Sequence, residues 1–164
     1  MNSQDVIDFH RAAKSRGLRF WVDGGWAVDA LLGRQTRPHG DLDIAVDKST
    51  EPGLVALLVG RGFHETDRET EWNYVMVDPP GRRIDFHVFI FDEKREVAGG
   101  LLYPTDSLTG KGVIDGVEVD CIPPGHLVKF HTGYELREKD FKDVSALCAK
   151  FKLQIPREYD GFGV

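Results

Sequence analysis

Residues 20–44 read FWVDGGWAVDALLGRQTRPHGDLDI and join a glycine pair to an alternating pair of aspartates. Gly24 and Gly25 follow a hydrophobic run and precede a short helical pattern. A glycine pair taken alone is usually a tight turn. At the start of a helix, such a pair leaves backbone N–H groups open to the close approach of an anion. The glycine half of this stretch is therefore a candidate phosphate site.

The aspartate half of the stretch has the spacing of a strand with two carboxylates on one face. Asp41 and Asp43 lie two residues apart, whereas Leu42 and Ile44 would face the core. Alone, this pattern is more often a solvated strand face. Beside a phosphate site, however, two mutually repelling carboxylates suit Mg²⁺, which takes one or two carboxylates together with water and phosphates. Asp85 lies in a second alternating strand, and pairing of the two strands would bring three carboxylates together.

The length and charge of the chain limit its class. Its 164 residues fit one domain, which we expect to span residues 1–164. Within it, residues 1–95 would form a catalytic sheet core, and residues 96–164 a hairpin and helices that complete a cleft. The net charge of −6 argues against a nucleic-acid partner. No run approaches the roughly 20 apolar residues of a membrane span, so no membrane partner is expected.

The first residues and the cysteines indicate a cytoplasmic protein. Residues 1–17 are polar and lack the apolar centre of a signal peptide. Cys121 and Cys148 lie far apart, match no metal-ligand spacing and are expected to stay reduced.

Hydrophobic periodicity and breaker residues predict an α/β (α+β) chain with a small mixed sheet flanked by helices, ending in C-terminal helices. Ser3 is a candidate cap for the first helix and Gly17 a candidate stop. The expected helices cover residues 3–17, 26–32, 51–61, 126–134 and 139–151, the expected strands cover 19–22, 41–46, 72–77 and 83–91, and a hairpin covers 113–122.

The order of these motifs carries a family resemblance. Strand, Gly-Gly, helix, Asp-x-Asp strand and a later strand aspartate together resemble the DNA polymerase β-type nucleotidyltransferase superfamily. More narrowly, WVDGGWAVDALLGRQTRPHGDLDIAV is similar to the small antibiotic nucleotidyltransferases, which include lincosamide nucleotidyltransferases and aminoglycoside 2″-adenylyltransferases. FHTGYELREKDFKDV, at residues 130–144, is similar to the lincosamide group. The resemblance spans residues 20–151 and implies a polymerase β-like fold.

The resemblance also implies an activity and a set of site residues. A nucleoside monophosphate, usually AMP from ATP or another nucleoside triphosphate, would pass to a hydroxyl of a small acceptor with release of pyrophosphate. Gly24 and Gly25 would hold the triphosphate, and Asp41 and Asp43 would bind Mg²⁺ or Mn²⁺. Asp85 matches the third carboxylate, which is either a metal ligand or the base that deprotonates the acceptor. This assignment agrees with metal-assisted in-line displacement.

Other polar residues have a structural and a functional interpretation. Arg37 and His39 either contact phosphate or orient an aspartate, although Arg37 could also be a solvated loop residue. Lys129 is the candidate cation for the β- and γ-phosphates. Asp23 is expected to cap the helix after the glycines. Asp29 is either a surface residue or an anchor of the glycine loop.

The acceptor cannot be chosen from the sequence. A lincosamide or an aminoglycoside is expected, and an acidic run at residues 65–71 either attracts a polycation or forms a solvated edge. Two other functions stay open: an antitoxin-type module that modifies or binds a toxin protein, and a non-catalytic nucleotide-binding module. A homodimer that completes the acceptor site is also open.

Overall fold

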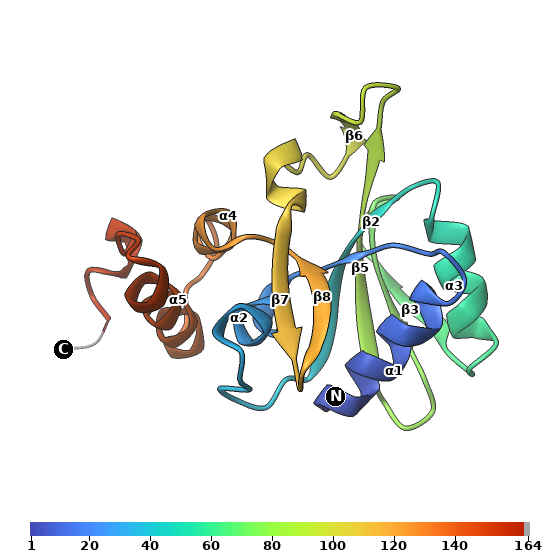
Figure 1. Cartoon of the computed structure of the whole chain (residues 1–164), viewed down its shortest axis with the longest axis horizontal. Helices are drawn as coiled ribbons and strands as arrows, with labels where there is room; N and C mark the ends of the chain where they lie inside the picture. The colour runs from blue at the N-terminus through green and yellow to red at the C-terminus, as the bar shows by residue number, and fades with distance from the viewer. Residues whose placement is uncertain (163–164) are drawn as a thin grey trace.

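The computed structural model describes residues 1–162 and is built on one mixed sheet of eight strands (Figure 1). The strands run in the order β3-β4-β5-β2-β1-β8-β7, and β6 pairs with the C-terminal part of β5. β2 and β5 are parallel, as are β1 and β8, while the other neighbours are antiparallel. The strands are β1 (Trp21–Val22), β2 (Asp41–Asp47), β3 (His64–Arg68), β4 (Asn73–Val77), β5 (Arg83–Phe91), β6 (Val97–Gly100), β7 (Gly110–Ile114) and β8 (Val117–Cys121).

Two groups of helices accompany the sheet. Figure 1 shows that the first group consists of α1 and α3, which lie side by side near β3 and β5. The second group consists of α2, α4 and α5, which lie toward the C-terminal end of the molecule. The helices are α1 (Ser3–Lys14), α2 (Gly24–Leu32), α3 (Glu51–Val59), α4 (Pro124–Phe130) and α5 (Glu138–Phe151), with 3₁₀ turns η1 (Thr105–Leu108) and η2 (Arg157–Tyr159). The mixed α/β fold class is therefore confirmed. Within residues 1–162, no helix combines the length and apolar character needed to span a membrane.

The central strands follow the alternation in the sequence. In β2, Leu42 and Ile44 are fully buried, while Asp41 and Asp43 lie on the other face and are partly exposed. β5 repeats the pattern with a buried Phe86 and a partly exposed Asp85. Each apolar side chain buried in this way contributes roughly 1.5–3 kcal/mol. The core thus fixes which face presents the carboxylates.

Several element boundaries differ from those expected. Asn2 rather than Ser3 caps α1, because its side chain accepts from the Asp5 N–H at 2.9 Å. α2 begins at Gly24, two residues before the expected start, and β1 is two residues shorter than expected. α4 begins two residues early, because Pro124 has a backbone angle suited to a first helical turn, and ends at Phe130. The expected hairpin is present, with Asp115 and Gly116 both at positive φ in its turn.

Candidate active site

The glycine pair forms the first turn of α2. Asp23 precedes it and accepts a hydrogen bond from the Gly24 N–H at 2.8 Å, so the capping role expected for Asp23 is confirmed. Because this bond uses the Gly24 N–H, the open N–H groups of the turn are expected from Gly25 onward. Gly24 has φ +56°, a conformation that favours glycine.

The two aspartate-bearing strands pair with each other, as was needed to bring the three carboxylates together. β2 and β5 are parallel neighbours, and their register places Asp43 opposite Asp85 and Asp41 opposite Arg83. The Asp23 N–H donates to the Asp43 carbonyl at 2.9 Å, which ties the start of the glycine turn to the same strand. The three carboxylates of the sequence prediction therefore lie on one face of two adjacent strands.

Both halves of residues 20–44 meet at the glycines. A side chain at Gly24 would clash with Asp43, because a Cβ built there would lie 2.8 Å from Cγ of that residue and closer still to its Oδ2. A Cβ at Gly25 would lie 2.5 Å from Nδ1 of His39 and 2.7 Å from Nη2 of Arg37. Only glycine allows this close approach, so the glycine pair and the residues around Asp43 form a single site.

Mutual repulsion and burial disturb the ionisation of the carboxylates. Burial, together with the charges of Asp41, Asp23 and Asp85, raises the pKa of Asp43 to about 7, although His87 opposes this shift. Burial and the nearby Asp41 raise the pKa of Asp85, and one of its buried oxygens, Oδ1, has no hydrogen-bond partner. Such a cluster gains stability from a bound cation.

The donor set fits a divalent cation whose shell is shared with a substrate. Among residues 1–162, no group of three or more His, Cys, Asp or Glu side chains is arranged to hold a metal alone. Mg²⁺ commonly takes one or two carboxylates and completes its octahedron with water and substrate phosphates. Asp41 and Asp43, beside an open helix N-terminus, meet that requirement.

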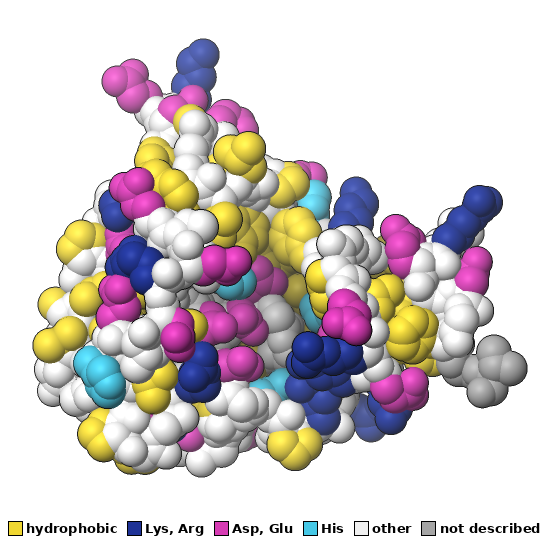
Figure 2. Space-filling model, turned by 180° about the vertical axis from the view of Figure 1, so that it is seen from behind, with side chains coloured by type: hydrophobic (Ala, Val, Ile, Leu, Met, Phe, Trp, Pro, Cys, Tyr) yellow, Lys and Arg dark blue, Asp and Glu magenta, His cyan; other side chains and the backbone are white. Residues whose placement is uncertain are grey.

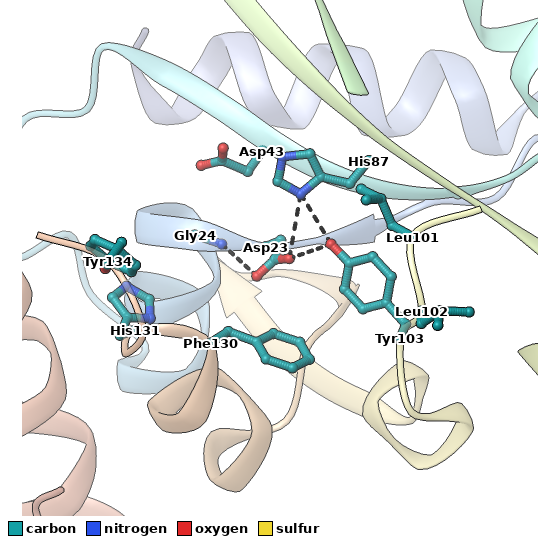
Figure 3. Close-up of a pocket in the computed structure, with 10 residues that line it drawn as sticks. All are labelled: Asp23, Gly24, Asp43, His87, Leu101, Leu102, Tyr103, Phe130, His131 and Tyr134. Carbon is teal, nitrogen blue, oxygen red and sulfur yellow. Dashed lines mark hydrogen bonds and ion pairs between the residues drawn. The ribbon is translucent and has the colours of Figure 1, made fainter. Parts of the chain in front are cut away.

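A hydrogen-bonded network lies next to Asp43, and one of its members, Tyr103, was not predicted from the sequence. Tyr103 Oη donates to Asp23 Oδ2 at 2.8 Å and lies 3.0 Å from Nδ1 of His87 (Figure 3). Burial would lower the pKa of His87, but the hydrogen bond to Asp23 and the charge of Asp43 raise it. Burial would raise the pKa of Asp23, but His87 and Tyr103 lower it. Alternation in β5 places His87 on the face of Asp85, but no sequence pattern points to Tyr103.

Arg37 and His39 are held in place by carboxylates. Arg37 Nη2 forms an ion pair with Asp143 of α5 at 2.7 Å, and the Asp143 side chain is 3% exposed. His39 Nε2 lies 2.5 Å from Asp29 Oδ2. Asp29 is buried, which excludes a surface role, and it accepts from the Thr36 N–H at 3.0 Å as well as contacting His39. It therefore anchors the loop before β2 rather than the glycine loop.

Two adjoining cavities share Gly24, Asp43, His131 and Tyr134. The first is the apolar cavity, which has a volume of about 490 Å³. The second is the polar cavity, which has a volume of about 510 Å³. The apolar cavity is also lined by Asp23, His87, Leu101, Leu102, Tyr103 and Phe130. The polar cavity is also lined by Gly25, Arg37, His39, Gly40, Asp41, Glu135, Arg137, Lys139 and Asp140.

The polar cavity contains most of the predicted nucleotide residues. Figure 2 shows a hollow in which acidic and histidine side chains gather, with lysine and arginine side chains on its rim. Lys129 is exposed and lines neither cavity, whereas Arg137 and Lys139 line the polar cavity. Neither residue was predicted as a site residue from the sequence, although both belong to the charged block that follows Phe130.

Comparison with known proteins finds relatives that are named as antibiotic nucleotidyltransferases or antibiotic resistance proteins. A family model described as aminoglycoside-2″-adenylyltransferase matches residues 5–147. A lincosamide resistance protein from Staphylococcus haemolyticus is 28% identical over 140 residues, which cover 79% of this chain and 84% of that protein. A 2″-aminoglycoside nucleotidyltransferase from Escherichia coli is 38% identical over 73 residues, which cover 41% of each chain.

Solved structures show the same architecture. The lincosamide antibiotic adenylyltransferase LnuA, with lincomycin bound, has a TM-score of 0.80 at 22% identity, and the match covers 90% of this chain and 96% of that one. ANT(2″)-Ia in complex with adenylyl-2″-tobramycin has a TM-score of 0.77 at 22% identity, with 91% and 88% covered. The expected nucleotidyltransferase fold is thereby confirmed.

Proposed function

The chain belongs to the aminoglycoside-2″-adenylyltransferase family, and from this premise we propose that it transfers a nucleoside monophosphate to a hydroxyl of an antibiotic. The nucleotide is ATP or another nucleoside triphosphate, the cation is Mg²⁺ or Mn²⁺, and pyrophosphate leaves. The observation that carries the proposal is the contact of the glycine pair with Asp43, Arg37 and His39, because it joins an open helix N-terminus to a carboxylate cluster.

The two cavities divide the substrates between them. We assign the triphosphate to the polar cavity, where the first turn of α2 from Gly25 onward offers backbone N–H groups. Arg37, Arg137 and Lys139 offer positive charge in the same cavity. We assign the acceptor to the apolar cavity. Asp43 lines both, so the reacting phosphorus and the acceptor hydroxyl would meet beside it. The proposed roles of His39 as a phosphate contact and of Lys129 as a phosphate-binding cation remain predictions.

The carboxylates would hold the cation and take up the acceptor proton. Asp41 and Asp43 would bind the divalent ion, which when present neutralises triphosphate charge. Asp85, whose Oδ1 has no partner, would complete the metal site or accept the proton of the attacking hydroxyl. Asp85 lines neither cavity, so it would act from its position opposite Asp43 in the adjacent strand.

The test is pyrophosphate release from each of the four nucleoside triphosphates with Mg²⁺, in the presence of lincomycin or tobramycin. We expect acceptor-dependent release by the natural chain and a loss of at least a thousandfold in Asp43→Asn, because this variant lacks a charged metal ligand. Asp8→Asn, an exposed change on α1 outside both cavities, is the matched control and should keep full activity.

The other outcomes separate the remaining functions. Full activity of Asp43→Asn would overturn the proposed metal site. Nucleotide binding without release would favour a non-catalytic module, and nucleotide transfer to a co-purified protein would favour the antitoxin function. Light scattering of the same samples would test whether the chain forms a homodimer, which the sequence leaves open.

A further inference from the structure

We infer that the apolar cavity selects an acceptor that carries an apolar substituent and at most one positive charge, and that Leu102 contacts this substituent. The inference rests on the assignment of the acceptor to this cavity in the proposed function. Three features support it: one wall of the cavity is apolar, the carboxylates in the cavity already have partners, and the acidic run at residues 65–71 lies outside the cavity.

The wall of the cavity is formed by a short segment and by α4. Figure 3 shows Leu101, Leu102 and Tyr103 following one another along the chain on one side, with Phe130 of α4 nearby. The rings of Tyr103 and Phe130 meet edge to face, with centroids 5.6 Å apart. Leu102 is 78% exposed, more than any other large hydrophobic residue between positions 1 and 162. An exposed leucine on a cavity wall gains when an apolar part of a ligand covers it.

The carboxylates of this cavity are already engaged. Asp23 is 6% exposed and accepts hydrogen bonds from the Gly24 N–H and from Tyr103 Oη. Its Oδ2 also lies 3.8 Å from Nδ1 of His87. Asp43 is assigned to the metal. The cavity therefore offers an ammonium-rich ligand no free carboxylate, and a polycation would lose solvation there without gaining ion pairs.

The acidic run that suggested a polycationic acceptor lies elsewhere. Residues 65–68 belong to the edge strand β3, three positions from β2 in the sheet. Glu65 is paired with Arg68 at 2.5 Å, and Asp67 lies 3.7 Å from Arg83. None of these residues lines either cavity. The acidic run is therefore a solvated edge and does not select the acceptor.

The test measures acceptor binding by calorimetry in the presence of Mg²⁺, which is assigned to Asp43, and without nucleotide, so that it does not depend on turnover. The probes are lincomycin, which carries one basic amine, and tobramycin, a polycation. The natural chain should bind lincomycin at least tenfold more tightly than tobramycin. Leu102→Asn should raise the Kd for lincomycin about tenfold, as expected for loss of a partly covered leucine contact. Val59→Asn, at an exposed apolar position on α3, is the matched control and should leave this Kd unchanged.

A second variant tests the charge argument. Tyr103→Phe keeps the ring packed against Phe89 and Phe130 but removes the hydroxyl that engages Asp23. The freed carboxylate oxygen should strengthen tobramycin binding severalfold and leave lincomycin binding nearly unchanged. No gain for tobramycin would overturn the role given to Asp23 in selecting charge.

Three results would overturn the inference. These are tighter binding of tobramycin than of lincomycin by the natural chain, an unchanged lincomycin Kd in Leu102→Asn, and a change of molecular mass by light scattering in that variant. The last result would show that a second copy of the chain covers Leu102. Lincomycin binding without any nucleotide transfer would instead overturn the proposed function and leave the inference standing. Failure of both probes to bind would overturn the two together.

Discussion

At the scale of single residues, the site depends on the absence of side chains as much as on their presence. Gly24 gives Asp43 its space, and Gly25 gives space to His39 and Arg37. The glycine and aspartate positions were predictable from the sequence because their spacing is local. The contact of Asp23 with Tyr103 was not predictable, since 80 residues separate the two and only the folded chain brings them together.

Gly24→Ala tests this use of empty space. Alanine at φ +56° costs about 1–2 kcal/mol of stability, and its Cβ would displace Asp43. We expect transfer to fall about a hundredfold, because small displacements of reacting groups have effects of that size. Gly33→Ala is the matched control: Gly33 has φ +74° at the other end of α2, with no atom near its would-be Cβ. Chemical denaturation and pyrophosphate release on both variants make the comparison. A similar loss of transfer in both would show that backbone strain, rather than the Asp43 contact, is responsible.

At the scale of elements, the alternation of polar and apolar residues predicted the strands that have one buried face. It did not predict the strands that lack such a face. β2 and β5 have one buried face, and both were predicted with their carboxylates on the correct side. β3 was missed because all five of its residues are exposed, which leaves no hydrophobic period in its sequence. β6 was also missed, since two of its four residues are glycine.

The position of Arg37 depends on α5, and Asp143→Ala tests this link. The Asp143 carboxylate is buried and accepts from both Nε and Nη2 of Arg37. Its removal leaves a partly buried guanidinium without its carboxylate partner, and among residues 1–162 only the Pro38 carbonyl still accepts from it, so the free energy of unfolding should fall by about 2 kcal/mol. The KM for ATP should rise severalfold, because Arg37 is no longer fixed at Gly25. Lys142→Ala, in the neighbouring exposed pair with Glu138, should change stability by less than about 0.5 kcal/mol. Equal effects of the two variants in urea unfolding would contradict the link.

At the scale of the whole molecule, the cleft is built from two parts of the chain that share one sheet. Residues 1–95 contribute the glycines and the aspartates, and residues 96–164 were expected to complete the cleft. β8 of the second part pairs in parallel with β1 of the first, and α2 contacts β7, α4 and α5. Lys150 of α5 donates to the Leu31 carbonyl at the end of α2 at 2.8 Å. Each part would therefore have an unpaired strand at the edge of its sheet if the other part were absent.

This arrangement predicts that the chain unfolds as a single unit. Trp21, Trp26 and Trp72 all lie in the first part, so tryptophan fluorescence reports on that part, while far-UV circular dichroism also reports on α4 and α5. Because β1 lies between β2 and β8, loss of either part exposes the core of the other, and both probes should give the same urea midpoint. Arg157→Ala, an exposed change in η2, should leave the two curves superimposed. Separate midpoints would show that the C-terminal helices fold independently, in which case the polar cavity would open without loss of the aspartate cluster.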